Sequence, residues 1–313
     1  MIVCIIGSGL SALTLAKALV NQKISVDMVF SKKKNKIDRS RTIGISKSNF
    51  EYFNNNIINI NKIIWKLKKI DIYSDNIKNE KILNFEDKQD QLFSIVKNYK
   101  LYEYLFNSLS NDKYYKIINP RKMSTKYDNY NLIINCDPFS YFTKKFFSKK
   151  IVKTYNSLAY TTIINHEKIL NDSAIQIFTK KGPLAFLPIS KNKTSIVYSI
   201  HNSKSFKNEN INKLINQYNF KYKIFKIEKI KSFDLKSFVL RSYFHNNILA
   251  FGDLLHTLHP LAGQGFNMTI RDIIILNNII KEKTELGLPL DLSVNKDFEK
   301  KLKHKNYIFL NSI

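Results

Sequence analysis

The chain is poor in the residues that hold together small disulfide-linked or metal-linked proteins. Its 313 residues include two cysteines, six prolines, eight glycines and one tryptophan. Cys4 and Cys136 make no metal-type spacing, offer no disulfide framework, and suit a reducing compartment. The hydrophobic fraction of 44% is ordinary for a globular protein, and the length allows one large or two modest domains.

Acidic side chains are also scarce. The net charge is +26, from 51 basic and 25 acidic residues, and such an excess attracts anionic membranes or nucleic acid. Lysine, asparagine and isoleucine are frequent everywhere, including plain loops, which favours compositional drift with weak membrane attraction as a by-product. Because no segment clusters aromatic and basic residues as nucleic-acid-binding motifs do, we expect no nucleic-acid partner.

The N-terminal segment MIVCIIGSGLSALTLAKALV is almost uncharged and has the length of a signal peptide. No basic residue precedes its apolar run, however, and two glycines interrupt it. The pattern predicts a strand, a turn, a helix and a second strand at residues 2–6, 7–9, 10–20 and 25–30. Gly7 and Gly9 permit a tight turn and close backbone approach to a pyrophosphate, while Ala12 permits close helix–strand packing.

A second glycine-rich segment runs from Phe251 to Asp272, with the sequence FGDLLHTLHPLAGQGFNMTIRD. It follows a predicted strand at 247–251 and precedes an apolar-periodic helix, which Pro260 prevents from starting earlier. Gly263, Gln264 and Gly265 therefore lie at the helix N-terminus. Free N–H groups and the helix dipole favour an anionic or electron-rich ligand there. Asp253, after the strand, could accept hydrogen bonds from ligand hydroxyls.

This pattern, Gly252-Asp253-x-x-His256-x-x-His259-Pro260-x-x-Gly263-Gln264-Gly265-x-Asn267-x-x-x-x-Asp272, resembles the second flavin fingerprint of the FAD-dependent aromatic monooxygenases of the p-hydroxybenzoate hydroxylase fold. It most resembles their ubiquinone-biosynthesis hydroxylase branch. The resemblance implies that Asp253 bonds the ribityl chain of FAD and that the Gly-Gln-Gly backbone faces the flavin ring. It also implies that Pro260 and Asn267 belong to the cofactor site.

Two further segments extend the resemblance. Residues 38–46, DRSRTIGIS, resemble a family segment whose arginine lies near the FAD phosphates, so Arg41 is a candidate; the alternative is a solvated loop arginine. Asp137 ends an apolar strand and occupies a family position that touches both FAD and the pyridine nucleotide; the alternative is a turn-forming aspartate. Pro138 replaces the family glycine and weakens the case for NAD(P)H as reductant.

The sequence departs from the family elsewhere too. The second strand ends Val29-Phe30-Ser31-Lys32, without the acid that usually holds the adenosine ribose. Leu254 and Leu255 replace small residues and need extra room beneath their loop. Relatives continue beyond Ile313, so we expect either a short form or a fragment.

Residues 157–200 alternate apolar and polar side chains and predict an antiparallel sheet. Part of this region, 174–188, resembles a segment of the ubiquinone branch whose sheet walls the substrate cavity beside the flavin. Phe186, Leu187 and Pro188 are therefore pocket candidates, with a purely structural strand as the alternative. Further helices are expected at 50–63, 101–109, 211–218 and 297–313.

His256 and His259 have a spacing that could suit two metal ligands on a helix. No third ligand follows at a usual spacing, and Pro260 disfavours a helix there. We therefore expect no metal and predict that His256 orients the loop through a ring hydrogen bond.

These observations predict an α/β fold: a discontinuous, Rossmann-like FAD-binding domain with an inserted β-rich substrate domain. The FAD-binding domain is expected at residues 1–69, 98–150 and 241–313, and the substrate domain at 70–97 and 151–240.

The resemblance implies hydroxylation of the aromatic ring of a polyprenylated ubiquinone precursor, through a flavin C4a-hydroperoxide formed with O2. The reductant would be NAD(P)H or a ferredoxin-type protein, and no side chain is nominated as an acid or base. A cytoplasmic protein attached peripherally to an anionic inner membrane face, within a ubiquinone-biosynthesis assembly, would suit such a substrate. Two alternatives stay open: a related FAD-dependent lipid oxidoreductase, and a degenerate, non-catalytic scaffold.

Overall fold

The chain begins with the βαβ unit that the glycine spacing predicts. The computed structural model describes residues 1–30, 39–75, 80–87, 91–119, 127–201, 208–257 and 264–311. β1 (Ile2–Ile6), α1 (Leu10–Asn21) and β2 (Ser25–Val29) follow one another, and β1 pairs with β2 in parallel. Most of β1 and nine residues of α1 are buried, which explains why this segment is almost uncharged.

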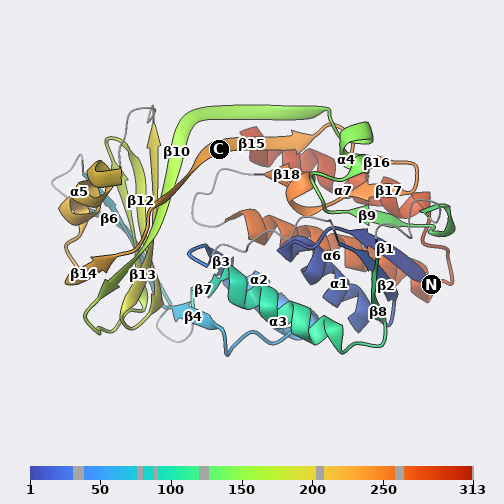
Figure 1. Ribbon diagram of the computed structural model, residues 1–313, viewed down its shortest axis with the longest axis horizontal. Coiled ribbons are helices and arrows are strands. Elements are labelled where there is room, and N and C mark those ends of the chain that lie inside the picture. The colour runs from blue at the N-terminus through green and yellow to red at the C-terminus, as the bar shows by residue number, and fades with distance from the viewer. Residues whose placement is uncertain are drawn as a thin grey trace.

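β1 lies in a sheet that, among the described residues, has six strands in the order β16-β17-β9-β1-β2-β8 (Figure 1). The remaining strands are β8 (Tyr115–Ile118), β9 (Ile133–Asn135), β16 (Phe244–His245) and β17 (Ile248–Ala250). All pairings from β17 to β8 are parallel, and β16 is an antiparallel edge. From β1 the chain builds towards β2 on one side, and β9 is added later on the other. The switch point between β1 and β9 is where open α/β sheets bind ligands.

α1 packs on this sheet together with α3 (Asn98–Ser110). The other helices on this side of the molecule are α2 (Lys47–Asn56), α4 (Tyr141–Phe146), α6 (Gln264–Glu285) and α7 (Leu292–Asn311). α1 contacts α3 and α6, and α6 contacts α7. The predicted apolar face of α3 is confirmed, because Leu101, Leu105 and Leu109 are fully buried.

Two helix boundaries differ from those expected. α2 ends at Asn56 rather than at 63, because the Asn54 side chain accepts a hydrogen bond from Ile60 N at 2.8 Å and so competes with helix continuation. α7 begins at Leu292 rather than at 297. Asp291 precedes it and its Oδ1 accepts from Ser293 N at 2.9 Å, which caps the first turn.

The second large sheet has nine strands among the described residues. Eight run in the order β18-β15-β10-β13-β12-β11-β5-β6, and β14 pairs with β10. Their bounds are β5 (Lys69–Ser74), β6 (Glu80–Glu86), β10 (Lys150–His166), β11 (Ser173–Thr179), β12 (Gly182–Ser190), β13 (Lys193–His201), β14 (Ile224–Ile227), β15 (Lys231–Leu240) and β18 (His256–Thr257). The antiparallel pairing of β10 to β13 confirms the alternation seen in the sequence. α5 (Asn208–Tyr218) shares a buried cluster with one face of this sheet.

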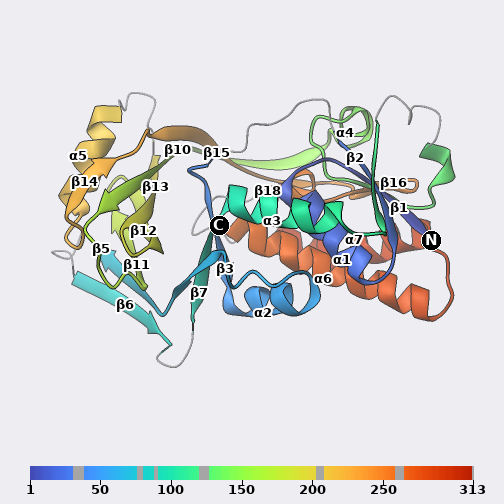
Figure 2. The ribbon, with the colours of Figure 1, turned by 60° about the horizontal axis from the view of Figure 1, so that its bottom comes forward.

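A small sheet stands between these two parts. β3 (Thr42–Ser46), β7 (Phe93–Lys97) and β4 (Ile64–Leu67) pair antiparallel, and β4 and β7 contact β12. Figure 2 shows β3 and β7 between the nine-stranded sheet and helices α2 and α3. The long strands β10 and β15 of the nine-stranded sheet run side by side and extend towards the six-stranded sheet (Figure 1). We call the six-stranded sheet with its helices the parallel half, and the nine-stranded sheet with α5 the antiparallel half. No helix in the described ranges is long and apolar enough to cross a membrane.

Candidate functional site

The carboxyl ends of β1, β9 and β17 lie at one edge of the parallel half, and we call the region bordered by the glycine turns that follow them the glycine-lined crevice. Gly7 follows β1 with φ +125°, a conformation that side chains rarely adopt. A Cβ on Gly7 would lie 3.3 Å from Asp137 N and 3.3 Å from Cys136 Cβ. The turn after β1 therefore packs directly against the turn after β9.

Gly252 brings the second glycine motif onto the first. Its φ is +65°, and a Cβ there would lie 2.6 Å from the Cβ of Ser11 in the first turn of α1. Ala12, the next residue of α1, is fully buried. The two fingerprints, more than 200 residues apart in sequence, thus share one side of the crevice.

Two other glycines have space around them where a side chain would lie. A Cβ on Gly9 or Gly265 would meet no other described atom within 4 Å. Gly9 is the N-cap of α1, where no side chain caps the helix, and Gly265 is in the first turn of α6. Both helices therefore direct free N–H groups and positive dipole ends into accessible space. This combination of tightly packed and open glycines fits a dinucleotide whose phosphates approach the backbone.

Carboxylates border the crevice. Asp253, directly after β17, is exposed, and Asp137, directly after β9, is buried. Burial, and then the charges of Asp253 and Asp137, raise the pKa of the Cys136 thiol. Cys136 is therefore held as the thiol, which excludes the thiolate chemistry of nucleophilic cysteines.

Asp137 also closes the turn that contains Pro138. Its Oδ1 accepts from Phe139 N at 2.8 Å, and its carbonyl oxygen accepts from the Thr143 hydroxyl at 2.6 Å. The turn-forming role considered for Asp137 is therefore present, and a contact with FAD stays a prediction. The same holds for Arg41, whose side chain is exposed and whose carbonyl oxygen accepts from Asn98 N at 3.0 Å at the start of α3.

Asn267 has a positioning role that the sequence did not reveal. Its Oδ1 accepts from Ser46 N at 3.1 Å and from Asn49 Nδ2 at 2.9 Å, and its Nδ2 donates to the Gly44 carbonyl oxygen at 3.0 Å. These bonds hold the first turn of α6 against β3 and α2. The amide oxygen is fully used by them, so Asn267 would act on a cofactor by fixing the helix that carries Gly265.

A buried polar network joins β18, α6 and α7. His256 Nε2 bonds Asp272 Oδ2, which confirms the predicted ring hydrogen bond. Arg271 Nη2 donates to Asp272 Oδ1 at 2.7 Å and also bonds Asn306 of α7, whose Nδ2 donates to the Tyr243 hydroxyl at 3.0 Å. No group of three metal-ligating side chains occurs in the described ranges.

The three pocket candidates do not share one face of β12. Phe186 is buried beneath α5, with its ring centroid 5.9 Å from that of Tyr222. Leu187 lies on the other face and packs against the cluster of Leu67, Ile95 and Ala174. Its cross-strand partner Ser195 bonds Thr42 of β3 at 3.1 Å between hydroxyl oxygens. Leu187 therefore faces the small sheet of β3, β7 and β4, whereas Phe186 faces α5; Pro188 is buried.

The structure shows the surroundings of the residues at which the sequence departs from the family. Phe30 follows β2, and the one acid within that strand, Asp27, accepts a hydrogen bond from Tyr130 at 2.5 Å. Leu254 and Leu255 are fully buried in the main core, so the fold provides the room that they need. Ser31, His259, Pro260 and Gly263 lie outside the described residues, as does the side chain of Gln264.

Comparisons with known proteins agree with this geometry. The model of the family described as FAD binding domain matches residues 152–284. The 3-demethoxyubiquinol 3-hydroxylase of Escherichia coli is 31% identical over 122 residues, which cover 37% of this chain and 31% of that protein. The ubiquinone hydroxylase UbiL of Rhodospirillum rubrum is 24% identical over 144 residues, covering 43% of this chain and 33% of that protein. The chain thus spans about a third of the length of these curated relatives.

Solved structures extend the likeness to the whole chain. PqsL from Pseudomonas aeruginosa, described as a probable FAD-dependent monooxygenase, superposes with a TM-score of 0.78 at 13% identity, covering 99% of this chain and 93% of that one. The p-nitrophenol 4-monooxygenase PnpA from Pseudomonas putida gives a TM-score of 0.73 at 11% identity, covering 98% and 88%. At these identities the likeness shows the shared fold.

The chain shares the fold of these FAD-dependent monooxygenases, and its residues 152–284 match the family described as FAD binding domain. Curated proteins that it resembles in sequence include ubiquinone hydroxylases.

Proposed function

We propose that this protein is a FAD-dependent monooxygenase that hydroxylates the aromatic ring of a polyprenylated ubiquinone precursor. The observation that carries the proposal is the junction of the two glycine motifs: Gly252 packs on Ser11 while Gly9 and Gly265 stay open. A glycine turn that had arisen by chance would not be expected to bring together the carboxylate of Asp253 and the free N-termini of α1 and α6. The names of the curated relatives support the ubiquinone assignment.

Each part of the crevice has a role toward the cofactor. The Gly9 backbone and the α1 N-terminus would bind the pyrophosphate of FAD, with Gly7 and Ala12 giving the close approach and Arg41 adding charge. Asp253 would accept hydrogen bonds from the ribityl hydroxyls, with Asp137 beside it. Bound FAD would supply the oxygen chemistry.

The loop into α6 would serve the flavin ring. The Gly263-Gln264-Gly265 backbone and the α6 dipole would stabilise negative charge on the ring, and Pro260 would shape the loop that precedes them. Asn267 and the pair of His256 and Asp272 would hold this arrangement from behind.

The antiparallel half would bind the substrate. We propose residues 1–69, 98–150 and 241–313 as the FAD-binding domain and 70–97 and 151–240 as the substrate domain. Leu187, on the face of β12 that packs against the small sheet, is the best placed of the three pocket candidates. Phe186 and Pro188 would support that face from behind. Apolar side chains there would exclude water from the reacting ring.

The remaining partners follow from the chemistry of the substrate. A polyprenylated phenol is dissolved in the membrane, so we propose peripheral attachment of this basic protein to the anionic inner face, as part of a ubiquinone-biosynthesis assembly. The reductant would be NAD(P)H or a ferredoxin-type protein. Pro138, with no N–H in the turn after β9, favours the latter.

A non-catalytic scaffold is the second candidate. The absence of an acid at Phe30 and the presence of Pro138 favour it, since both weaken contacts that the family makes with nucleotides. Retention of the open glycines and of Asp253 favours the enzyme.

The visible absorption spectrum of the purified protein distinguishes the two. We expect stoichiometric, non-covalent FAD, released on denaturation, and then incorporation of one oxygen atom from isotopically labelled O2 into a short-chain prenylated phenol. A folded protein that cannot be loaded with FAD would overturn the enzyme and leave the scaffold. FAD binding with oxidation but no labelled oxygen in the product would indicate the lipid oxidoreductase instead.

A further inference from the structure

The nine-stranded sheet has a face that is turned away from α5, and the registers of its strands give the side chains that lie there. A row of cross-strand neighbours crosses six strands, from the edge strand β6 to β10. Its members, each paired with the next, are Leu83, Ile72, Gln176, Ala185, Val197 and Thr161. Because Ala185 and Leu187 are two residues apart in β12, the row lies on the same face as Leu187.

A second row lies beside the first, two residues further along each strand. In it Phe178 pairs with Pro183, and Ala159 pairs with Phe233 of β15. Among the described residues, no apolar side chain of either row belongs to a buried cluster. Leu83 is 52% exposed, Phe178 48% and Phe233 44%. The two rows therefore form an apolar strip that reaches solvent at both ends and in the middle, which we call the uncovered strip.

The shape of the uncovered strip limits what can bind there. Neighbouring strands lie about 4.8 Å apart and alternate residues of one strand about 6.8 Å, so the strip is about 29 Å long and about 14 Å wide. Its area of roughly 400 Å² is well below the about 800 Å² per partner that a stable protein–protein interface buries. A linear apolar chain therefore fits the strip better than a second copy of the protein does.

The uncovered strip also lacks charge. Charged residues make up 24% of the chain, but the members of the two rows include none. The amide nitrogen of Gln176 donates to the Leu184 carbonyl oxygen at 3.3 Å, so it is bonded within the sheet. Charge begins at the β15 end, where Lys231 pairs with Thr161. The strip thus suits a molecule with an apolar chain and a polar group at the β15 end.

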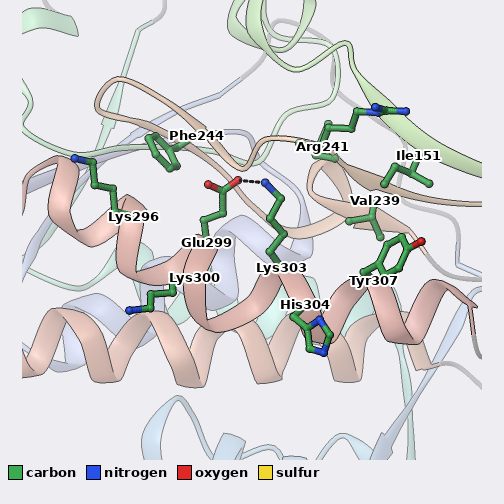
Figure 3. Close-up of a pocket in the computed structure, with 11 residues that line it drawn as sticks. Ile151, Val239, Arg241, Phe244, Lys296, Glu299, Lys300, Lys303, His304 and Tyr307 are labelled. Atoms are coloured by element: carbon green, nitrogen blue, oxygen red, sulfur yellow. Dashed lines mark hydrogen bonds and ion pairs between the residues drawn. The ribbon is translucent and has the colours of Figure 1, made fainter.

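A groove between α7 and the strands β10, β15 and β16 differs from the strip in charge (Figure 3). Lys296 and Lys300 lie at one end of this groove and Arg241 at the other. Between them Glu299 accepts a hydrogen bond from Lys303 at 3.1 Å, so a basic face of α7 lies over β15 and β16. An uncharged chain bound there would take these charges out of water without replacing their hydration, which costs free energy. The uncovered strip imposes no such cost.

We propose that the uncovered strip binds the polyprenyl tail of the substrate. The inference rests on the proposed function and gives the tail a binding surface outside the reaction cavity. The aromatic ring lies at the β10 and β15 end, because these strands extend towards the six-stranded sheet (Figure 1). The tail crosses β13, β12, β11 and β5 to β6, the strand at the opposite edge. There it passes Leu83 and the exposed side chain of Phe85, two residues further along β6.

The test is a binding titration of the full chain with 2-prenylphenol and with 2-geranylgeranylphenol, which share one ring and differ in tail length. Trp65, the single tryptophan, packs in the cluster that contains Leu187, so its fluorescence reports binding on this face. The parent should bind the long-tailed phenol more tightly. L83Q/F85Q should weaken that binding about tenfold, which corresponds to about 55 Å² of apolar surface no longer covered. Binding of 2-prenylphenol should not change, because its short tail ends before β6.

The matched control is L170Q/F225Q, which replaces an exposed leucine and an exposed phenylalanine outside the strip. It should change the binding of either phenol by less than about twofold, since surface substitutions away from a site have small effects. Thermal unfolding of both double variants should match that of the parent for the same reason.

The outcomes separate the strip from the enzyme. Equal weakening by the two double variants would overturn the strip in favour of general hydrophobic adsorption, and full binding of 2-geranylgeranylphenol by L83Q/F85Q would overturn it directly. A parent dimer that L83Q/F85Q alone converts to a monomer in sedimentation would assign the strip to a second copy. Binding of neither phenol by the parent would overturn both the strip and the proposed substrate, while the FAD spectrum would still test the enzyme.

Discussion

In the parallel half, the candidate site consists of backbone groups after β1, β9 and β17, whereas in the antiparallel half the face of β12 that packs against the small sheet consists of side chains. The crevice tolerates no side chain at Gly252 and almost none at Gly7. The face of β12 holds Leu187, where another apolar residue of similar volume would serve. A site made of backbone restricts residue identity strongly, and a site made of an apolar face restricts only polarity and volume.

The buried histidines of the two halves show a second contrast. His256 in β18, at the entry to α6, bonds the carboxylate of Asp272. His166, at the end of β10, bonds the Glu167 carbonyl oxygen at 2.8 Å and the Thr194 hydroxyl at 2.9 Å. The first ring is tied into a charged network that reaches α7, and the second is held by neutral groups. The two should therefore respond differently to substitution.

The largest effect is expected for Asp272→Asn. A neutral amide cannot balance Arg271, and removing one partner of a buried ionic group costs about 3 kcal/mol of unfolding free energy. Denaturant unfolding measures this loss. The matched control Asp234→Asn, at an exposed position of β15, should change the free energy by less than about 0.5 kcal/mol. Similar losses in both variants would show that the network contributes nothing specific.

Gly252→Ala should cost about 2 kcal/mol, because the new Cβ meets Ser11 and the backbone φ of +65° strains any side chain. Adding Ser11→Gly removes the steric part and should restore about half of the loss. A double-mutant cycle of thermal unfolding measures the coupling. Without any recovery in the double variant, the cost would belong to the backbone conformation alone and not to the junction of the motifs.

A smaller effect on the free energy of unfolding is expected from His166, a single ionisable group, as the pH falls. Burial lowers the pKa of His166 below its ordinary value of 6.5, so the folded state keeps the ring neutral. Below pH 6.5 the unfolded chain binds a proton that the folded chain does not, and stability falls; above pH 6.5 the full contribution is present. His166→Gln should flatten this slope in unfolding measured across a pH series. An unchanged slope would mean that the folded ring accepts the proton.

Gly9→Ala should have the smallest effect on the free energy of unfolding, but it should clearly weaken FAD binding. The φ of Gly9 is −77° and its surroundings are open, so the unfolding free energy should change by less than about 1 kcal/mol. The methyl group would nevertheless occupy the space expected for the pyrophosphate and weaken FAD binding at least about tenfold, the equivalent of one charge-assisted hydrogen bond. Flavin absorbance titration measures this. Unaltered FAD affinity would place the phosphates away from α1.

Local patterns predicted much of the parallel half. Gly7, Gly9 and Ala12 gave the strand, turn and helix almost to the residue, because a tight βα turn depends on neighbours in sequence. The end of α2 was missed, since periodicity extended the helix while the Asn54 side chain terminated it. In the antiparallel half, alternation predicted the strands, but the family resemblance grouped Phe186 with Leu187, which the structure places on opposite faces of β12.

By itself, the sequence determined where the backbone must be bare and where helices must begin, because glycine and apolar periodicity act through local sterics. Only the tertiary structure decided which distant residues meet. Gly252 reaches Ser11, Asn267 reaches β3, and the basic face of α7 lies over β15 and β16, since each contact joins segments that pack together only when the core forms. Such contacts depend on long-range packing, which no local pattern encodes.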